Sequence, residues 1–223
     1  MTVLLVITTI VIFLLVDFVR SRKAVTRQVA ETAPEMQHVP RVPSDYVAGF
    51  QLPLNLQYHP GHTWALRESP TLVRVGFDDF AAKLLGRVEN LLLPKRGQWI
   101  RQGQKIFRIE RNGAEVELVS PIEGEITGVN DAVAKDPSVI GGEPYGRGWL
   151  LTVTAPDAET CLRNLLNGNL ARKWMTDTAE RLRAKMPALA GAVAQDGGVA
   201  VHDLSEHLPD EEWGALAREF FLT

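Results

Sequence analysis

The stretch Lys105-Ile-Phe-Arg-Ile-Glu-Arg-Asn-Gly-Ala-Glu-Val-Glu-Leu-Val-Ser-Pro121 decides the fold of this 223-residue chain. Two strand-like runs, 105–111 and 114–119, flank the pair Asn112-Gly113. An Asn-Gly pair between such runs is a strong hairpin signal, because both central residues of a type I′ turn need positive φ angles. Pro121 ends the second run, since proline has no N–H to donate to a sheet. The stretch therefore predicts a β-hairpin.

The sequence on both sides of the hairpin carries a series of motifs. These are, in chain order, His62-Thr-Trp64, Val75-Gly-Phe-Asp-Asp-Phe-Ala-Ala-Lys-Leu-Leu-Gly86, Gly97-Gln-Trp-Ile-Arg-Gln-Gly103, Ser120-Pro121-Ile-Glu-Gly124 and Glu143-Pro-Tyr-Gly-Arg-Gly-Trp-Leu150. Their order resembles the H protein of the glycine cleavage system over roughly residues 58–175. The resemblance implies a mainly β, barrel-sandwich hybrid fold of the lipoyl/biotinyl carrier type. It also implies lipoate as the cofactor.

The residue that would hold lipoate is missing from the hairpin. The family carries lipoate on a lysine in the hairpin turn, in a Glu-Ser-Val-Lys-Ala-like motif, three residues after the glutamate. Glu110 matches that glutamate, so Gly113 takes the lysine position, and no lysine occurs between Lys105 and Lys135. We therefore expect no lipoate and no other cofactor. The tip is either a remodelled contact for a protein partner or a remnant that stabilises the fold; its residues are Glu110, Arg111, Asn112, Gly113, Ala114 and Glu115.

Residues 2–19 are apolar except for threonines and Asp17 near their end. As a helix, this segment spans about 27 Å, close to the ~30 Å hydrocarbon core of a membrane. Arg20, Arg22 and Lys23 follow directly, without a cleavage site of small residues. The pattern predicts an uncleaved single-pass transmembrane anchor, with the globular part held in the cytoplasm by these positive charges.

The composition divides the chain into four predicted segments. Residues 1–23 form the anchor, and residues 24–57 form a linker whose prolines break any periodicity, although its apolar end can pack on the domain. Short strands punctuated by glycines fill residues 58–156 and indicate a barrel or sandwich. Residues 157–223 have helical periodicity, with a helix near 170–186 that presents Leu170 and Leu182 on one face, and a last helix from Pro209 to about Phe221.

Several functional classes are excluded or disfavoured. A net charge of −3 gives no basic field for nucleic acid. The single cysteine, Cys161, excludes an internal disulfide and a cysteine metal cluster. Two histidine pairs, His59 with His62 and His202 with His207, match no zinc signature, so structural or surface roles are favoured and we expect no metal. No phosphate loop, nucleophile elbow or Cys–His pairing is present, so we expect no enzyme activity.

The glutamates of the hairpin form a dense acidic series. Because alternate residues of a strand share a face, Glu115 and Glu117 form either an acidic edge beside Arg108 or Arg111, or ordinary cross-strand ion pairs.

Three functions remain open from the sequence. The leading hypothesis is a membrane-anchored, H-protein-like scaffold that is not lipoylated and binds a protein partner, such as a glycine cleavage enzyme or a membrane complex. The alternative is a lipoyl-dependent aminomethyl carrier of the glycine cleavage system, which would need lipoylation elsewhere or a second, lysine-bearing copy. A third is an enzyme subunit regulated through its C-terminal helices.

Overall fold

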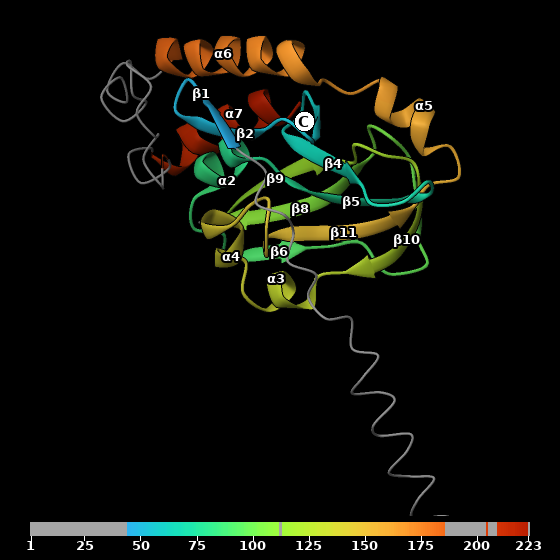
Figure 1. Ribbon diagram of the computed structural model, residues 1–223. Helices are drawn as coiled ribbons and strands as arrows, with labels where there is room; N and C mark the ends of the chain where they lie inside the picture. The colour runs from blue at the N-terminus through green and yellow to red at the C-terminus, as the bar shows by residue number, and fades with distance from the viewer. Residues whose placement is uncertain (1–43, 112, 186–203, 205–208, 223) are drawn as a thin grey trace, which may run out of the picture. The chain divides into compact units, whose positions relative to one another are not determined.

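The hairpin is formed by strands β8 (Lys105–Arg111) and β9 (Ala114–Val119), with the bounds that the sequence predicts. Gly113 has a φ of +77°, the left-handed conformation that the turn requires. Strand β6 (Asn90–Leu92) pairs with β8, which gives the sheet order β6-β8-β9. The computed structural model describes residues 44–111, 113–185, 204 and 209–222, so Asn112 lies outside the described residues (Figure 1).

A second, antiparallel sheet faces the hairpin sheet. Its order is β3 (Gln57–His59), β4 (Thr63–Arg67), β5 (Leu72–Phe77), β11 (Trp149–Thr154), β10 (Gly124–Val129) and β7 (Trp99–Ile100). Side chains that alternate along the strands of both sheets are fully buried, and the rings of Phe77 and Phe107 meet edge to face at 5.1 Å. The prediction of a mainly β domain is confirmed.

The predicted linker is shorter than the sequence suggested. Strands β1 (Ser44–Val47) and β2 (Phe50–Pro53) pair around Ala48-Gly49, both of which have positive φ. Phe50 is fully buried, and its ring lies 5.0 Å from that of Phe80. Pro43 precedes this hairpin and Pro53 is its last residue, so these prolines border a folded segment. The apolar end of the predicted linker therefore forms a hairpin that packs on the domain.

Helices fill the connections and the C-terminal region. They are α2 (Asp79–Leu85), α3 (Asp131–Lys135), α4 (Ser138–Gly142), α5 (Ala158–Arg163), α6 (Gly168–Lys185) and α7 (Asp210–Phe221). Figure 1 shows α6 across the top of the view, with α7 beneath it, next to α2 and the hairpin strands. A helical C-terminal region is thus confirmed. The buried face of α6 centres on Met175 and Ala179, however, and Leu170 is 60% exposed.

None of the helices in the described part of the chain is long and apolar enough to cross a membrane. The anchor predicted over residues 2–19 lies outside the described residues.

Helix α2 is enclosed on all sides, because each of its residues is buried. Asp78 caps its N-terminus by accepting a hydrogen bond from Ala81 N at 2.8 Å. Within the helix, Asp79 Oδ2 lies 2.7 Å from Lys83 Nζ and also accepts a hydrogen bond from Gln51 N at 2.7 Å. This buried ion pair therefore ties the β1–β2 hairpin to α2.

Candidate functional site

The outer face of the hairpin carries a network of exposed ion pairs. Arg108 Nε lies 2.9 Å from Glu115 Oε1, and Arg108 Nη2 lies 3.5 Å from Glu117 Oε1. Lys105 Nζ lies 3.8 Å from Glu117 Oε2. These are the cross-strand pairs expected of solvated strands, and each exposed pair is worth at most about 1 kcal/mol.

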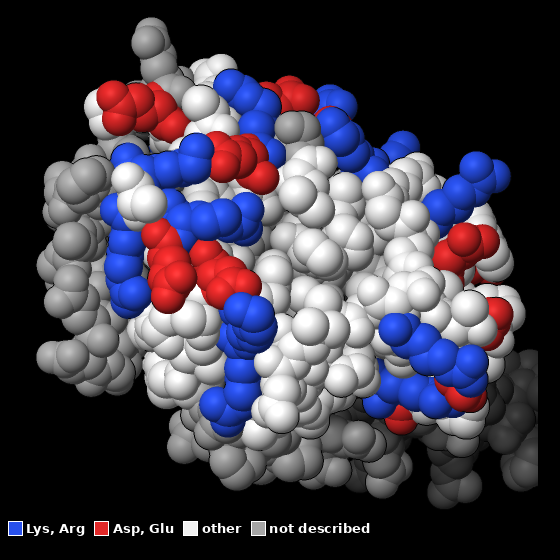
Figure 2. Space-filling model, turned by 90° about the horizontal axis from the view of Figure 1, so that it is seen from above, with Lys and Arg blue, Asp and Glu red and all other residues white. Residues whose placement is uncertain are grey.

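On the side of the molecule seen from above, acidic and basic side chains lie interleaved beside an uncharged centre (Figure 2).

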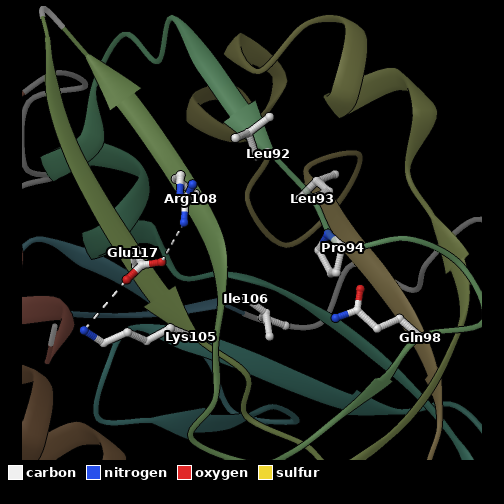
Figure 3. Close-up of a pocket in the computed structure, with 8 residues that line it drawn as sticks. All are labelled: Leu92, Leu93, Pro94, Gln98, Lys105, Ile106, Arg108 and Glu117. Carbon is white, nitrogen blue, oxygen red and sulfur yellow. Dashed lines mark ion pairs between the residues drawn. The ribbon is translucent and has the colours of Figure 1, made fainter.

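A groove of about 250 Å³ lies beside these ion pairs. Figure 3 shows Leu92, Leu93, Pro94 and Gln98 along one side and Arg108, Glu117 and Lys105 along the other, with Ile106 between them, so the first side is mostly apolar. Among the described residues, no group of histidine, cysteine or acidic side chains is arranged to hold a metal. The groove offers contact surface without a set of metal ligands.

At the tip of the hairpin, the inner face is covered by α7. Arg111 is only 9% exposed, and its guanidinium lies 5.2 Å from the ring centre of Trp213. A Cβ atom placed on Gly214 would lie 3.4 Å from Ala114 Cβ, so the helix backbone meets the tip directly. Arg218 Nη1 also donates to the carbonyl of Glu115 at 3.4 Å. Arg111 and Ala114 therefore face the C-terminal helix instead of solvent.

The same contacts complete the C-terminal end of α2. The last four carbonyls of a helix have no partner inside it. The first of them here, Ala82 O, accepts from Gly86 N at 3.2 Å. The other acceptors and their donors are Lys83 O with Leu204 N (3.0 Å), Leu84 O with Trp213 Nε1 (2.8 Å) and Leu85 O with Arg111 Nη1 (3.4 Å). The hairpin and the C-terminal region together satisfy this buried helix end.

An aromatic cluster continues this junction toward the end of α7. His62 stacks on Phe80 with ring centres 4.2 Å apart, and the ring centre of Phe220 lies 5.1 Å from that of Phe80 and 6.5 Å from that of His62. His62 Nδ1 lies 2.8 Å from Asp78 Oδ2, and both side chains are fully buried. His62 thus links the core to α2 and α7.

His59, the other half of the predicted pair, accepts a hydrogen bond from Gly61 N through Nδ1 at 3.0 Å. Burial, with a smaller contribution from His62, holds the pKa of His59 below its usual value. His202 and His207 lie outside the described residues.

The remaining tip residues lie on the exposed side or the rim. Glu110 Oε2 accepts from Asn90 Nδ2 at 3.1 Å, and Glu115 pairs with Arg108. Gly113 is exposed, and a Cβ placed on it would meet no atom within 4 Å. A side chain would have space there, but Gly113 has no amine. Lys105 begins β8 and pairs with Glu117, and Lys83 is buried against Asp79. The described residues of the tip therefore do not fit the attachment of lipoate.

This hairpin, in a mainly β domain that continues into helices, matches a known family. The model of the family described as glycine cleavage H-protein matches residues 56–178. The chain belongs to this family. H proteins are lipoyl carriers and are not themselves catalysts.

Curated H proteins agree with this assignment, and a solved H-protein structure is also similar to the chain. The glycine cleavage system H protein of Mycobacterium avium is 33% identical over 129 residues, which cover 56% of this chain and 98% of the relative. The H protein of Bifidobacterium longum is 38% identical over 108 residues, which cover 48% of this chain and 78% of the relative. The crystal structure of a glycine cleavage system H protein from Mycobacterium marinum is 30% identical, covers 57% of this chain and 98% of its own, and has a TM-score of 0.49.

Sequence reasoning missed the part of the site that α7 contributes. Trp213, Leu216, Ala217, Phe220 and Phe221 follow helical spacing and are all buried, which is the signature of an apolar helix face. That periodicity could have indicated a docked helix. It could not have named the H-protein hairpin as the surface that the helix covers.

Proposed function

We propose that this chain is a membrane-tethered H-protein-like module that carries no lipoate and binds a protein partner. The observation that carries the proposal is Gly113, an exposed glycine with a φ of +77° in the hairpin turn, where the family's motif leads us to expect the lipoyl-lysine. A glycine side chain cannot form the amide to lipoate. Two residues earlier, the guanidinium of Arg111 contacts the ring of Trp213 and donates a hydrogen bond to Leu85 O. The tip is thus built into a structural junction.

Two further features support a binding role for this barrel-sandwich domain. The outer face of the hairpin has an apolar groove wall, and Leu92 on that wall is 45% exposed. H proteins work with glycine cleavage enzymes, so we propose such an enzyme, or a complex at the membrane, as the partner class. No step of chemistry is assigned to the domain itself.

We expect purified full-length protein to carry no lipoyl group, and to support no aminomethyl transfer when glycine cleavage enzymes and lipoate are supplied. Intact-mass analysis with peptide mapping measures the first, and a reconstituted transfer assay measures the second. The physical reason is that no amine is present at Gly113. A lipoyl adduct mapped to any lysine would contradict the proposal and favour a working carrier.

The matched control is Gly113→Lys, which returns an amine to an open position. The backbone opposes it by about 1–2 kcal/mol, because a φ of +77° is strained for a residue with a side chain. We expect a lipoate ligase to modify this variant in part and to leave the wild type unmodified.

For the location, we propose a single-pass membrane protein with its globular part in the cytoplasm, supported by the apolar run 2–19 and the basic residues after it. We expect the full-length chain to sediment with membranes and to resist extraction by carbonate and high salt, since high salt screens charge pairs but does not weaken apolar burial. The unit Arg41–Thr223 should remain in the supernatant. Recovery of the full-length chain in the soluble fraction would contradict the anchor.

A further inference from the structure

Helix α7 lies beyond the matched family region, yet it completes the hairpin face. The family model ends at residue 178, and the Mycobacterium avium relative is covered over 98% of its length by only 56% of this chain. Little of that relative remains to correspond to α7, which begins at Asp210. The H-protein domain therefore has a face that α7 fills as an addition.

That face has the properties of a receptor for a helix. The carbonyl of Leu84 points at Trp213 Nε1 and accepts its hydrogen bond at 2.8 Å, and the guanidinium of Arg111 covers the same indole ring. About two helical turns after Trp213, Phe220 packs on Phe80 with ring centres 5.1 Å apart. A helix of suitable sequence is thus held by one specific donor, one stacked ring and aromatic anchors.

The polar contacts around α7 are weaker than these anchors. Lys185 Nζ lies 2.7 Å from Glu219 Oε2, but both side chains are 45% exposed, so the pair contributes little. The hydrogen bond from Arg218 to Glu115 O is long, at 3.4 Å, and exposed. The affinity of α7 for the face therefore resides in Trp213 and the phenylalanines, as it does in helix-in-groove recognition.

We infer that the face formed by α2, β9 and Arg111 is a docking site for an amphipathic helix of a partner protein, and that α7 occupies it in cis. The partner helix carries an indole donor at the position of Trp213 and apolar side chains three, four, seven and eight residues later. This inference rests on the proposed binding function and names its partner chemistry. Because α7 is tethered, its effective concentration is in the millimolar range, so a partner gains access only when α7 is released.

The test uses the full-length chain with a specific protease site inserted between residues 186 and 208, so that α7 can be cut from its tether. A second form adds Ala114→Cys and Gly214→Cys in a Cys161→Ser background. The 3.4 Å between the two Cβ positions is close to the ~3.5–4.5 Å of a disulfide, so oxidation locks α7 onto the hairpin. The probe is a fluorescent peptide of residues 209–222, followed by anisotropy.

We expect the cut chain to bind the peptide with an apparent Kd at least about 100-fold lower than the uncut chain. The oxidised double-cysteine form should bind none after cutting, and reduction should restore binding. A peptide with Trp213→Ala should bind at least about tenfold more weakly.

Circular dichroism shows whether the cut chain stays folded. If the cut chain unfolds, or keeps its own α7 without exchange under reducing conditions, then α7 is an integral part of the core and the inference is overturned. Equal binding to locked and reduced forms would overturn it as well. A lipoyl adduct would refute the proposed function but would leave this measurement unchanged, so the two failures are distinguishable.

Discussion

Replacing Trp213 by alanine is expected to lower the free energy of unfolding by about 3–5 kcal/mol, the usual cost of removing a buried tryptophan. The side chain is fully buried between α2 and the hairpin. Its loss leaves a cavity, leaves Leu84 O without its donor, and uncovers the guanidinium of Arg111. The first effect should be release of α7, since the lost side chain makes the hydrogen bond from this helix to α2.

Chemical denaturation of the unit Arg41–Thr223, followed by circular dichroism, measures the change in stability. Hydrogen exchange of α7 amides shows whether the helix opens before the sheets do. The matched control is Trp99→Ala, because Trp99 is 51% exposed and should change stability by about 0.5 kcal/mol or less. Similar losses for both tryptophans would contradict the structure.

Replacing Lys83 by methionine should cost about 3–5 kcal/mol, because it leaves the Asp79 carboxylate buried without its cation. The two side chains are only 6% and 8% exposed, and their charged atoms lie 2.7 Å apart. The ammonium also lies 5.4 Å from the ring centre of Phe50, so the change weakens the packing of the β1–β2 hairpin as well.

The same spacing on the surface provides the control for this ion pair. Lys173 and Asp177 are also four residues apart, at 3.3 Å, but are 75% and 54% exposed. Lys173→Met should therefore change stability by about 0.5 kcal/mol or less. Denaturant titrations of both variants at one pH make the comparison, and equal losses would show that burial does not govern the pair.

The loss in Lys83→Met should depend on pH in a defined direction. Burial already raises the pKa of Asp79 above its usual value, and Lys83 opposes that rise. Without Lys83, the folded variant holds its proton to a higher pH than the unfolded chain does. The free energy of unfolding of the variant should therefore fall as pH rises from the ordinary carboxyl pKa through the raised pKa of Asp79 in the folded state. The difference in unfolding free energy between wild type and variant should accordingly become smaller in acid. A gap that widens in acid would contradict this assignment.

The hairpin could be predicted residue by residue, because its signals are local. Asn112-Gly113 and Pro121 define the turn and the end of β9 by backbone geometry alone, and both strands have the predicted bounds. An aspartate cap for α2, at Asp78 or Asp79, follows from an equally local rule, and the structure shows that Asp78 is the cap. The absence of a lysine at the tip is also visible in the sequence alone.

The covered face could not be predicted, because it depends on contacts between distant segments. Alternation along β8 places Arg111 on the face of Phe107 and Ile109. Nothing near Arg111, however, indicates that Trp213 and Leu85 O contact its side chain. From the sequence, Pro43 and Pro53 are expected to interrupt secondary structure in a linker, although they border the β1–β2 hairpin. The helical spacing of apolar residues predicts Leu170 on the packed face of α6, but the structure buries Ala171 and Met175 instead.

The hydrogen bond between Trp213 and Leu84 joins residues 129 positions apart. Closing so long a loop adds little to the cost at equilibrium, because the entropy grows only with the logarithm of loop length. It delays assembly, however, since non-local contacts form late on the folding route. The hairpin and α2 must therefore form with their shared apolar face open to solvent, and this interval is when the chain is most exposed to self-association.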